Sequence, residues 1–120
     1  MRSAFSLVAL LFALSAGAQS VRVLVQSSPL AGFQYAEAAS LWPRLSVGDE
    51  LTLAREPGNP HDANAVRVEW RGHKLGYVPR RENAAVARGL ERGARLRARL
   101  SKLESHPNPA RRVEFEVYIE

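Results

Sequence analysis

The sequence contains no cysteine. This absence excludes disulfides, thiolate zinc sites, iron–sulfur clusters and a cysteine nucleophile. No internal repeat is present either, which excludes collagen-like and coiled-coil architectures. Because no disulfide can reinforce the fold, we expect packing alone to stabilise it.

Residue types that enzymes and metal sites use are also scarce. The three histidines, His61, His73 and His106, are predicted to lie in three different turns, with neither His-x₃-His nor HExxH spacing. The two aspartates, Asp49 and Asp62, also fall in predicted turns, and the glutamates fall mostly on predicted exposed faces. No glycine-rich phosphate loop or nucleophile elbow occurs. We therefore expect a binding module with no catalytic residues, metal or cofactor.

The length and composition of the chain fit one ordinary globular domain. The chain has 120 residues, of which 46% are hydrophobic and 24% charged. Its net charge of +5 comes almost entirely from arginine, which suits phosphate or other acidic partners.

Residues 1–18 have the pattern of a signal peptide. Arg2 supplies the positive start, residues 4–14 form an apolar run broken only by Ser6, and Ala16-Gly17-Ala18 fits a cleavage site before Gln19. The alternatives are a membrane anchor, for which the run is short of the ~20 residues needed, and a buried helix. Cleavage would leave residues 19–120, with no membrane span and a net charge of +4. We expect this mature protein to be exported, to a periplasm or beyond.

The alternation of apolar and polar residues predicts about six short strands. These are residues 21–26, 51–54, 66–70, 74–79, 94–104 and 113–120, with Val21, Val23 and Val25 forming a β-branched row on one face of the first. Arg71-Gly72 predicts a tight hairpin, and residues 37–42 could form one short helical turn. The main predicted helix is 82–92, ended by Gly93. A small curled sheet or closed barrel, with this helix across one end, accounts for the pattern because closure removes exposed edges.

The strand at 94–104 carries a stripe of arginines that resembles a phosphate track. Antiparallel pairing with the last strand predicts that glutamates offset this charge. The predicted pairs are Arg99–Glu114, Arg97–Glu116, Leu100–Val113, Ala98–Phe115 and Leu96–Val117. This register would make the stripe structural and not a nucleic-acid site.

Three blocks of sequence, in order, resemble the HIRAN domain family. They are AGFQYAEA at 31–38, LWPRLSVGDELTLAREPGNPHDANAVRV at 41–68 and RGHKLGYVPRREN at 71–83. REPGNPHDANAV followed by KLGYVPR is a specific combination, and the resemblance covers residues 22–103. It is closest to short bacterial members in which this domain, here 19–120, is nearly the whole protein.

The resemblance implies a mainly β fold, a small OB-fold-like or SH3-like barrel that grips the 3′ end of single-stranded DNA. In this family aromatic rings stack on terminal bases, an aspartate binds the 3′-hydroxyl, and a basic residue neutralises phosphate. The matching positions here are Tyr35, His61, Asp62, Tyr77 and Arg80. Gln34 replaces an arginine of the DNA-binding relative, and Ala36 replaces a second tyrosine. Hydrolase and zinc functions belong to ATPase and RING modules fused to other members, whose motifs this chain lacks.

Each matching residue also has a structural interpretation. Tyr35 could be an aromatic at the rim of the core, Asp62 could cap its own turn, and Arg80 with Arg81 could be solvated. Two functions therefore stay open: an exported binder of single-stranded nucleic acid, and an envelope module that binds protein or wall components on the same barrel face.

Overall fold

The structure is a computed structural model that describes residues 21–33 and 36–120. The predicted signal peptide, residues 1–18, lies outside the described residues. In the described part of the chain, no helix is both long and apolar enough to cross a membrane.

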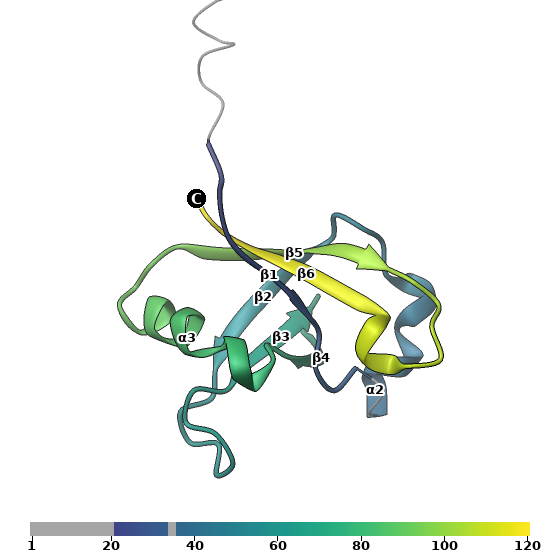
Figure 1. The fold of residues 1–120 in the computed structure, drawn as a ribbon, viewed down its shortest axis with the longest axis horizontal. Helices are drawn as coiled ribbons and strands as arrows, with labels where there is room; N and C mark the ends of the chain where they lie inside the picture. The colour runs from purple at the N-terminus through teal and green to yellow at the C-terminus, as the bar shows by residue number, and fades with distance from the viewer. Residues whose placement is uncertain (1–20, 34–35) are drawn as a thin grey trace, which may run out of the picture.

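Six antiparallel strands form one sheet in the order β1-β6-β5-β2-β3-β4 (Figure 1). The strands are β1 (Val23–Pro29), β2 (Glu50–Arg55), β3 (Val66–Trp70), β4 (His73–Tyr77), β5 (Leu96–Leu103) and β6 (Val113–Ile119). The mainly β, six-strand prediction is therefore confirmed. The hairpin between β3 and β4 also forms where predicted, because Arg71 (φ 47°) and Gly72 (φ 82°) both adopt the left-handed conformation of its turn.

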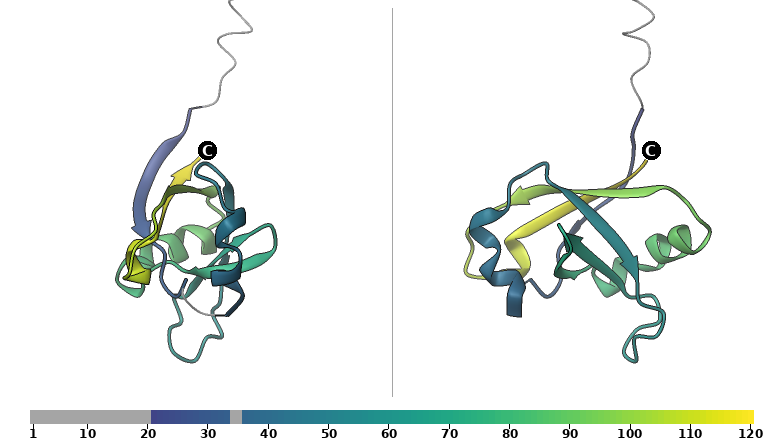
Figure 2. Two further views of the ribbon diagram at one scale, coloured as in Figure 1. Left: turned by 90° about the vertical axis from the view of Figure 1, so that its right-hand side faces the viewer. Right: turned by 180° about the vertical axis from the view of Figure 1, so that it is seen from behind.

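A single backbone bridge closes the sheet into a barrel. Ala31, just beyond β1, exchanges two hydrogen bonds of 2.9 Å with Tyr77 at the end of β4. Since β1 and β4 lie at opposite ends of the strand order, this bridge joins the two edges of the curled sheet (Figure 2). The approach requires glycine at position 76, where a Cβ atom would lie 2.2 Å from the Ala31 carbonyl oxygen.

Short helices fill the ends of the barrel. They are α2 (Ala36–Ser40), η1 (Trp42–Arg44), η2 (Arg80–Glu82), α3 (Ala84–Glu91) and η3 (Pro109–Arg111). The predicted main helix is therefore real but shorter than 82–92, because a 3₁₀ turn precedes it. Val86 and Ala87 of α3 enter the core, as does Trp70, which is 1% exposed. The largest fully buried side chains of the core are Trp70, Phe33, Phe115, Leu30, Leu75 and Leu100.

Polar contacts fasten β1 to the segment before α3. Ser28 is buried, and its hydroxyl donates to Glu82 Oε1 at 3.2 Å. Gln26 Nε2 donates to Ser28 Oγ at 3.0 Å and to the Glu82 carbonyl oxygen at 3.1 Å. These bonds link the first strand to the turn that carries Arg80.

The prediction for β1 is wrong in its limits and its face. The strand runs from Val23 to Pro29, and a bulge between Leu24 and Gln26 interrupts the alternation at Val25. The predicted row of three valines is broken, because Val21 precedes the strand and Val25 lies at the bulge. All three valines are exposed. His73 also differs from the prediction, because it is the first residue of β4 and not part of the turn.

The predicted register of β5 against β6 is wrong by two residues. Arg99 faces Glu116 and Arg97 faces Tyr118, while the apolar pairs become Leu100–Phe115, Ala98–Val117 and Leu96–Ile119. The return at 104–112 is longer than predicted because it contains η3, which displaces the pairing by three residues at Lys102–Glu114 and Leu103–Val113. The bulge between Leu100 and Lys102 reduces this displacement to two. A shift of two keeps each side chain on its predicted face.

Glutamates still offset the arginine stripe, although the pairs are not the predicted ones. Arg99 Nε lies 3.7 Å from Glu116 Oε1, and Arg97 Nε lies 3.1 Å from Glu120 Oε2. Glu114 instead lies 3.7 Å from the ammonium of Lys102.

Candidate functional site

The loop at 56–65, EPGNPHDANA, is a series of turns that its own side chains hold in place. Backbone hydrogen bonds run from Asn59 to Glu56, from Asp62 to Asn59 and from Ala65 to Asp62. Asn59 Oδ1 accepts from the His61 amide, and Asp62 Oδ1 accepts from the Asn64 amide, both at 2.9 Å. Asn and Asp favour such turns because their side chains accept from the backbone two residues on. This loop is therefore ordered without regular secondary structure.

Glu56 connects the start of this loop to the barrel. Its Oε1 accepts hydrogen bonds from the Tyr77 hydroxyl at 3.0 Å and from Asn59 Nδ2 at 3.2 Å, and its Oε2 accepts from Arg67 Nη1 at 3.0 Å. Burial alone would raise the pKa of Glu56. The hydrogen bonds from Tyr77 and Asn59 and the charge of Arg67 outweigh burial, so this pKa lies below its ordinary value.

Asp62 connects the end of the loop to the helix that follows β4. Its Oδ2 accepts a 2.7 Å hydrogen bond from Nδ2 of Asn83, a buried residue that directly precedes α3. The backbone N–H of Asn64, the Asn83 amide and the charge of Arg80 lower the pKa of Asp62. The structural interpretation of Asp62 is thus confirmed, since it caps its own turn. The hydrogen bonds from Asn64 and Asn83 do not use the full acceptor capacity of the carboxylate, because each oxygen can accept a further hydrogen bond.

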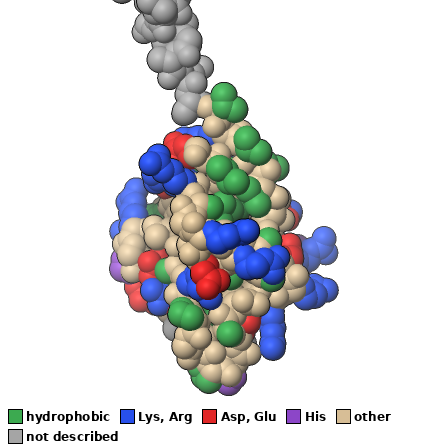
Figure 3. All heavy atoms as spheres, turned by 90° about the vertical axis from the view of Figure 1, so that its left-hand side faces the viewer, with side chains coloured by type: hydrophobic (Ala, Val, Ile, Leu, Met, Phe, Trp, Pro, Cys, Tyr) green, Lys and Arg blue, Asp and Glu red, His purple; other side chains and the backbone are tan. Residues whose placement is uncertain are grey.

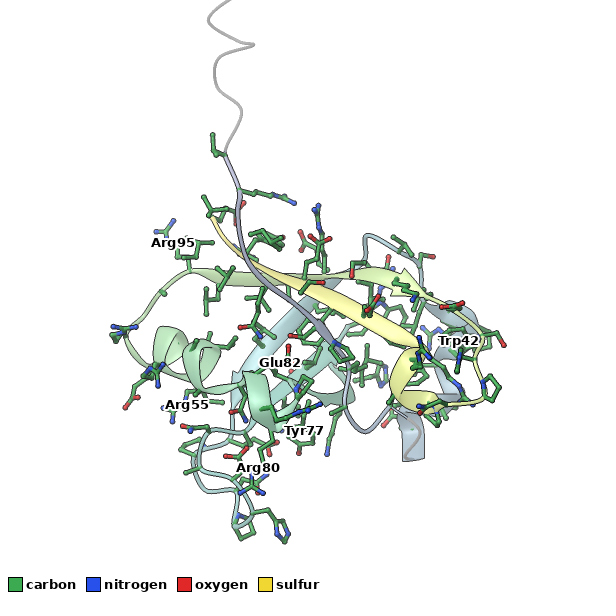
Figure 4. All side chains as sticks on the ribbon, viewed as in Figure 1. Trp42, Arg55, Tyr77, Arg80, Glu82 and Arg95 are labelled. Carbon is green, nitrogen blue, oxygen red and sulfur yellow. The ribbon has the colours of Figure 1, made fainter. Side chains whose placement is uncertain are left out.

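Four of the five predicted site residues line one groove of about 350 Å³. The described residues that line it are Ala31, Asn59, His61, Asp62, Ala65, Tyr77, Val78, Arg80 and Asn83. His61 and Arg80 are exposed, while Asp62 and Tyr77 are half-buried. Figure 4 shows Tyr77 and Arg80 close together at the lower side of the barrel, beside the loop. The fifth predicted residue, Tyr35, lies outside the described residues.

Tyr77 separates this groove from a second hollow of about 400 Å³. The second hollow is lined by Ala31, Gly32, Glu37, Ala38, Lys74, Leu75, Gly76 and Tyr77. The two hollows share Ala31 and Tyr77, the residues of the closing bridge. The ammonium of Lys74 lies 4.5 Å from the centre of the Tyr77 ring, which places a cation at the boundary between the two hollows.

Sequence reasoning missed the residues that support this site. Glu56 and Asn59 fall within the REPGNPHDANAV block, so that block already contained a signal for them. Lys74 and Asn83 fall within the RGHKLGYVPRREN block in the same way, but their positions beside Tyr77 and Asp62 depend on the tertiary fold. Within residues 21–33 and 36–120, no three His, Asp or Glu side chains gather as metal ligands would.

Replacing Glu56 with glutamine is expected to destabilise the fold at neutral pH and to flatten its acid response. Loss of a charged acceptor shared by three donors costs about 1–3 kcal/mol. Because the pKa of folded Glu56 lies below its ordinary value of 4.5, the charge stabilises the fold above that pH. This contribution is lost as the pH falls through the lower, folded value.

Urea unfolding between pH 7 and pH 2.5 measures this response. The wild type should lose stability below about pH 4.5 more steeply than Glu56→Gln does. Tyr77→Phe, which removes one donor to Glu56, should give an intermediate slope. If the free energy of unfolding varied with pH in the same way in the wild type and in Glu56→Gln, the role given to Glu56 would be contradicted.

A family model and two solved structures match this chain. The model of the HIRAN domain matches residues 23–120. A crystal structure of a protein from Lactobacillus plantarum is 28% identical, with a TM-score of 0.71, and the match covers 82% of this chain and 95% of that one. The crystal structure of the HIRAN domain of human HLTF is 19% identical, with a TM-score of 0.59 and coverage of 82% and 78%, a likeness of fold alone. No curated protein sequence matches the chain.

Proposed function

This chain belongs to the HIRAN domain family, and we propose that it binds single-stranded nucleic acid at a free 3′ end. The family is known for binding DNA. One observation carries the proposal: side chains suited to a hydroxyl, a base and a phosphate come from separate segments and line one groove. Asp62 and His61 come from the loop at 56–65, Tyr77 from β4 and Arg80 from η2.

Asp62 is the group that we propose to recognise the terminal hydroxyl. Its lowered pKa keeps the carboxylate ionised at neutral pH, and its two oxygens retain acceptor capacity beyond the bonds to Asn64 and Asn83. A 3′-hydroxyl can donate to such an oxygen. A 3′-phosphate cannot, and it would bring a second negative charge close to the first.

The remaining groove residues are suited to a base and a phosphate. His61 presents an exposed ring from a loop that its neighbours hold in place. Tyr77 has its hydroxyl bonded to Glu56 and Lys74 over its ring, so it forms a fixed wall of the groove. Arg80 is exposed, and the described residues include no salt-bridge partner for it. Its guanidinium can therefore contact a phosphate without breaking an ion pair.

We also infer that the protein acts without catalysis and outside the cytoplasm. The first inference rests on the scarcity of nucleophile–base and paired-carboxylate patterns in the sequence. The second rests on the signal-peptide pattern of residues 1–18.

Fluorescence anisotropy with labelled d(T)₆ tests the end preference. We expect the free 3′-hydroxyl form to bind at least about tenfold more tightly than the 3′-phosphorylated form, because the charged hydrogen bond is replaced by repulsion. A 5′-phosphorylated oligonucleotide is the matched control. Asp62→Asn removes the charge and keeps the size, so it should reduce the discrimination. Equal affinity for both 3′ forms would disprove end recognition.

One observation favours the second candidate, a module that binds an envelope protein. Exposed large hydrophobic residues gather on β1, just before it and at the adjoining end of β6 (Figure 3). This surface is not the groove face predicted for such a partner. They are Val21, Val23, Leu24, Val25 and Ile119. Surfaces of this kind often mark protein contacts. Failure of every oligonucleotide to bind at low salt would favour this candidate over the first.

A further inference from the structure

The second hollow, beyond Tyr77, is the larger of the two and has no role in end recognition. Its lining is mostly small and apolar, with Ala31, Gly32, Ala38 and Leu75 among its residues. At about 400 Å³ it falls within the size range of small-molecule sites, which combine apolar walls with a few polar groups. A nucleobase has this kind of surface, flat and apolar with a polar edge.

Lys74 is the cation of this hollow. Its side chain is exposed, and its ammonium lies over the Tyr77 ring and not against a carboxylate within salt-bridge distance in the described chain. Glu37, the acidic residue of the lining, is hydrogen-bonded to His73. The Lys74 charge is therefore available at the boundary between the hollow and the groove.

We propose that the second hollow receives the nucleotide next to the terminal one and that Lys74 binds the phosphate joining the two. This inference rests on the proposed function, because it requires a 3′ end in the groove. A strand that passes from one hollow to the next must cross Tyr77, so its linking phosphate comes to the place where the ammonium lies. An ammonium is a compact point charge that suits a phosphate oxygen.

The proposal also accounts for a departure from the family pattern. Gln34 stands where the DNA-binding relative has an arginine, so the first block of this chain lacks a cation. Lys74 supplies one from β4, a different part of the barrel. The terminal nucleotide has one phosphate, the linkage to its neighbour, so Arg80 and Lys74 would approach this same phosphate from the two sides of Tyr77.

A neutral linkage provides the sharpest test. The probes are d(T)₆, a version with a methylphosphonate at the last linkage before the 3′ end, and a version with the methylphosphonate at the first linkage. Lys74→Met removes the charge and keeps a long apolar side chain, and Lys74→Arg restores a cation. Lys102→Met is the matched control, since Lys102 is an exposed lysine of β5 held between Glu104 and Glu114. Thermal unfolding confirms that each variant is folded.

We expect Lys74→Met to weaken d(T)₆ binding about tenfold and to lower the slope of log affinity against log salt by about 0.7. The neutral last linkage should weaken wild-type binding by more than this factor, because it also removes the contact with Arg80, and should weaken Lys74→Met less than the wild type. Lys74→Arg and Lys102→Met should bind nearly as the wild type does.

Two results would overturn this assignment while leaving end recognition intact. One is wild-type affinity in Lys74→Met, and the other is an equal effect of the neutral last linkage in both proteins. If the wild type binds none of the probes at low salt, the proposed function and this inference fail together. If d(T)₆ binds with no preference for a free 3′ end but still depends on Lys74 and the last linkage, the phosphate contact stands and the end recognition fails.

Discussion

Replacing Gly76 with alanine is expected to destabilise the fold by about 3 kcal/mol or more, at the upper end of the range for overpacking a close contact. The new Cβ atom would lie 2.2 Å from the Ala31 carbonyl oxygen and 3.1 Å from Cγ of Leu30. The oxygen belongs to the backbone and accepts the hydrogen bond from the Tyr77 amide, so it cannot rotate away as a flexible side chain could. Relief of the clash requires the closing bridge to separate.

Gly58→Ala is the matched control for this substitution. Gly58 lies in the loop at 56–65, and a Cβ atom there would have no described atom within 4 Å beyond those of its own residue and its two chain neighbours. The same chemical change should therefore leave stability within about 0.5 kcal/mol of the wild type. Urea unfolding monitored by tryptophan fluorescence measures both variants. A Gly76→Ala protein as stable as Gly58→Ala would show that the bridge does not hold the barrel closed.

Closure of the barrel and formation of the site depend on the same residues. Ala31 and Tyr77 form the bridge, and both line the groove and the second hollow. The edge of the sheet that closes the barrel is thus also the wall between the two candidate nucleotide positions. The Gly76→Ala substitution should consequently reduce nucleic-acid binding as well as stability. A destabilising substitution elsewhere in the core need not alter this wall.

Local sequence patterns predicted most of the fold because strand alternation and turn chemistry act over a few residues. Val66, Val68 and Trp70 alternate with polar residues and are all buried in β3, as that pattern requires. The bulges at Val25 and Ser101 were not predictable in this way. A bulge changes which residues face each other without changing the composition of either strand. The register of β5 against β6 was displaced because the return at 104–112 contains η3 in place of a short turn.

The residues of the candidate site could be predicted from the sequence, but the hydrogen bonds that hold them in place could not. The resemblance to HIRAN domains, confirmed by the match over residues 23–120, identified His61, Asp62, Tyr77 and Arg80, which line one groove. The bonds from Tyr77 to Glu56 and from Asn83 to Asp62 each span 21 residues. No local pattern encodes contacts at that separation, because they form only when β4 and α3 pack against the loop.

Replacing Arg80 with alanine is expected to lower the affinity for d(T)₆ about ten- to a hundredfold. A charge-assisted contact to phosphate contributes about 1.5–3 kcal/mol, and 1.4 kcal/mol corresponds to a factor of ten. The fold should be almost unaffected, because Arg80 is exposed and the described residues include no salt-bridge partner for it. Anisotropy titration in 150 mM salt measures the affinity, and thermal unfolding measures stability.

The double variant Arg97→Ala/Arg99→Ala separates a positioned phosphate contact from general electrostatic attraction. The double variant removes two positive charges, whereas Arg80→Ala removes one. Arg97 and Arg99 are both on β5, across the barrel from the groove (Figures 1 and 4). Each of these two arginines lies against a glutamate. At 150 mM salt the screening length is about 8 Å, so charges on that face contribute little to a strand bound in the groove. We expect the double variant to bind d(T)₆ within about twofold of the wild type, since exposed ion pairs have small energetic effects. A larger loss in the double variant than in Arg80→Ala would mean that overall charge, and not the groove, attracts the nucleic acid.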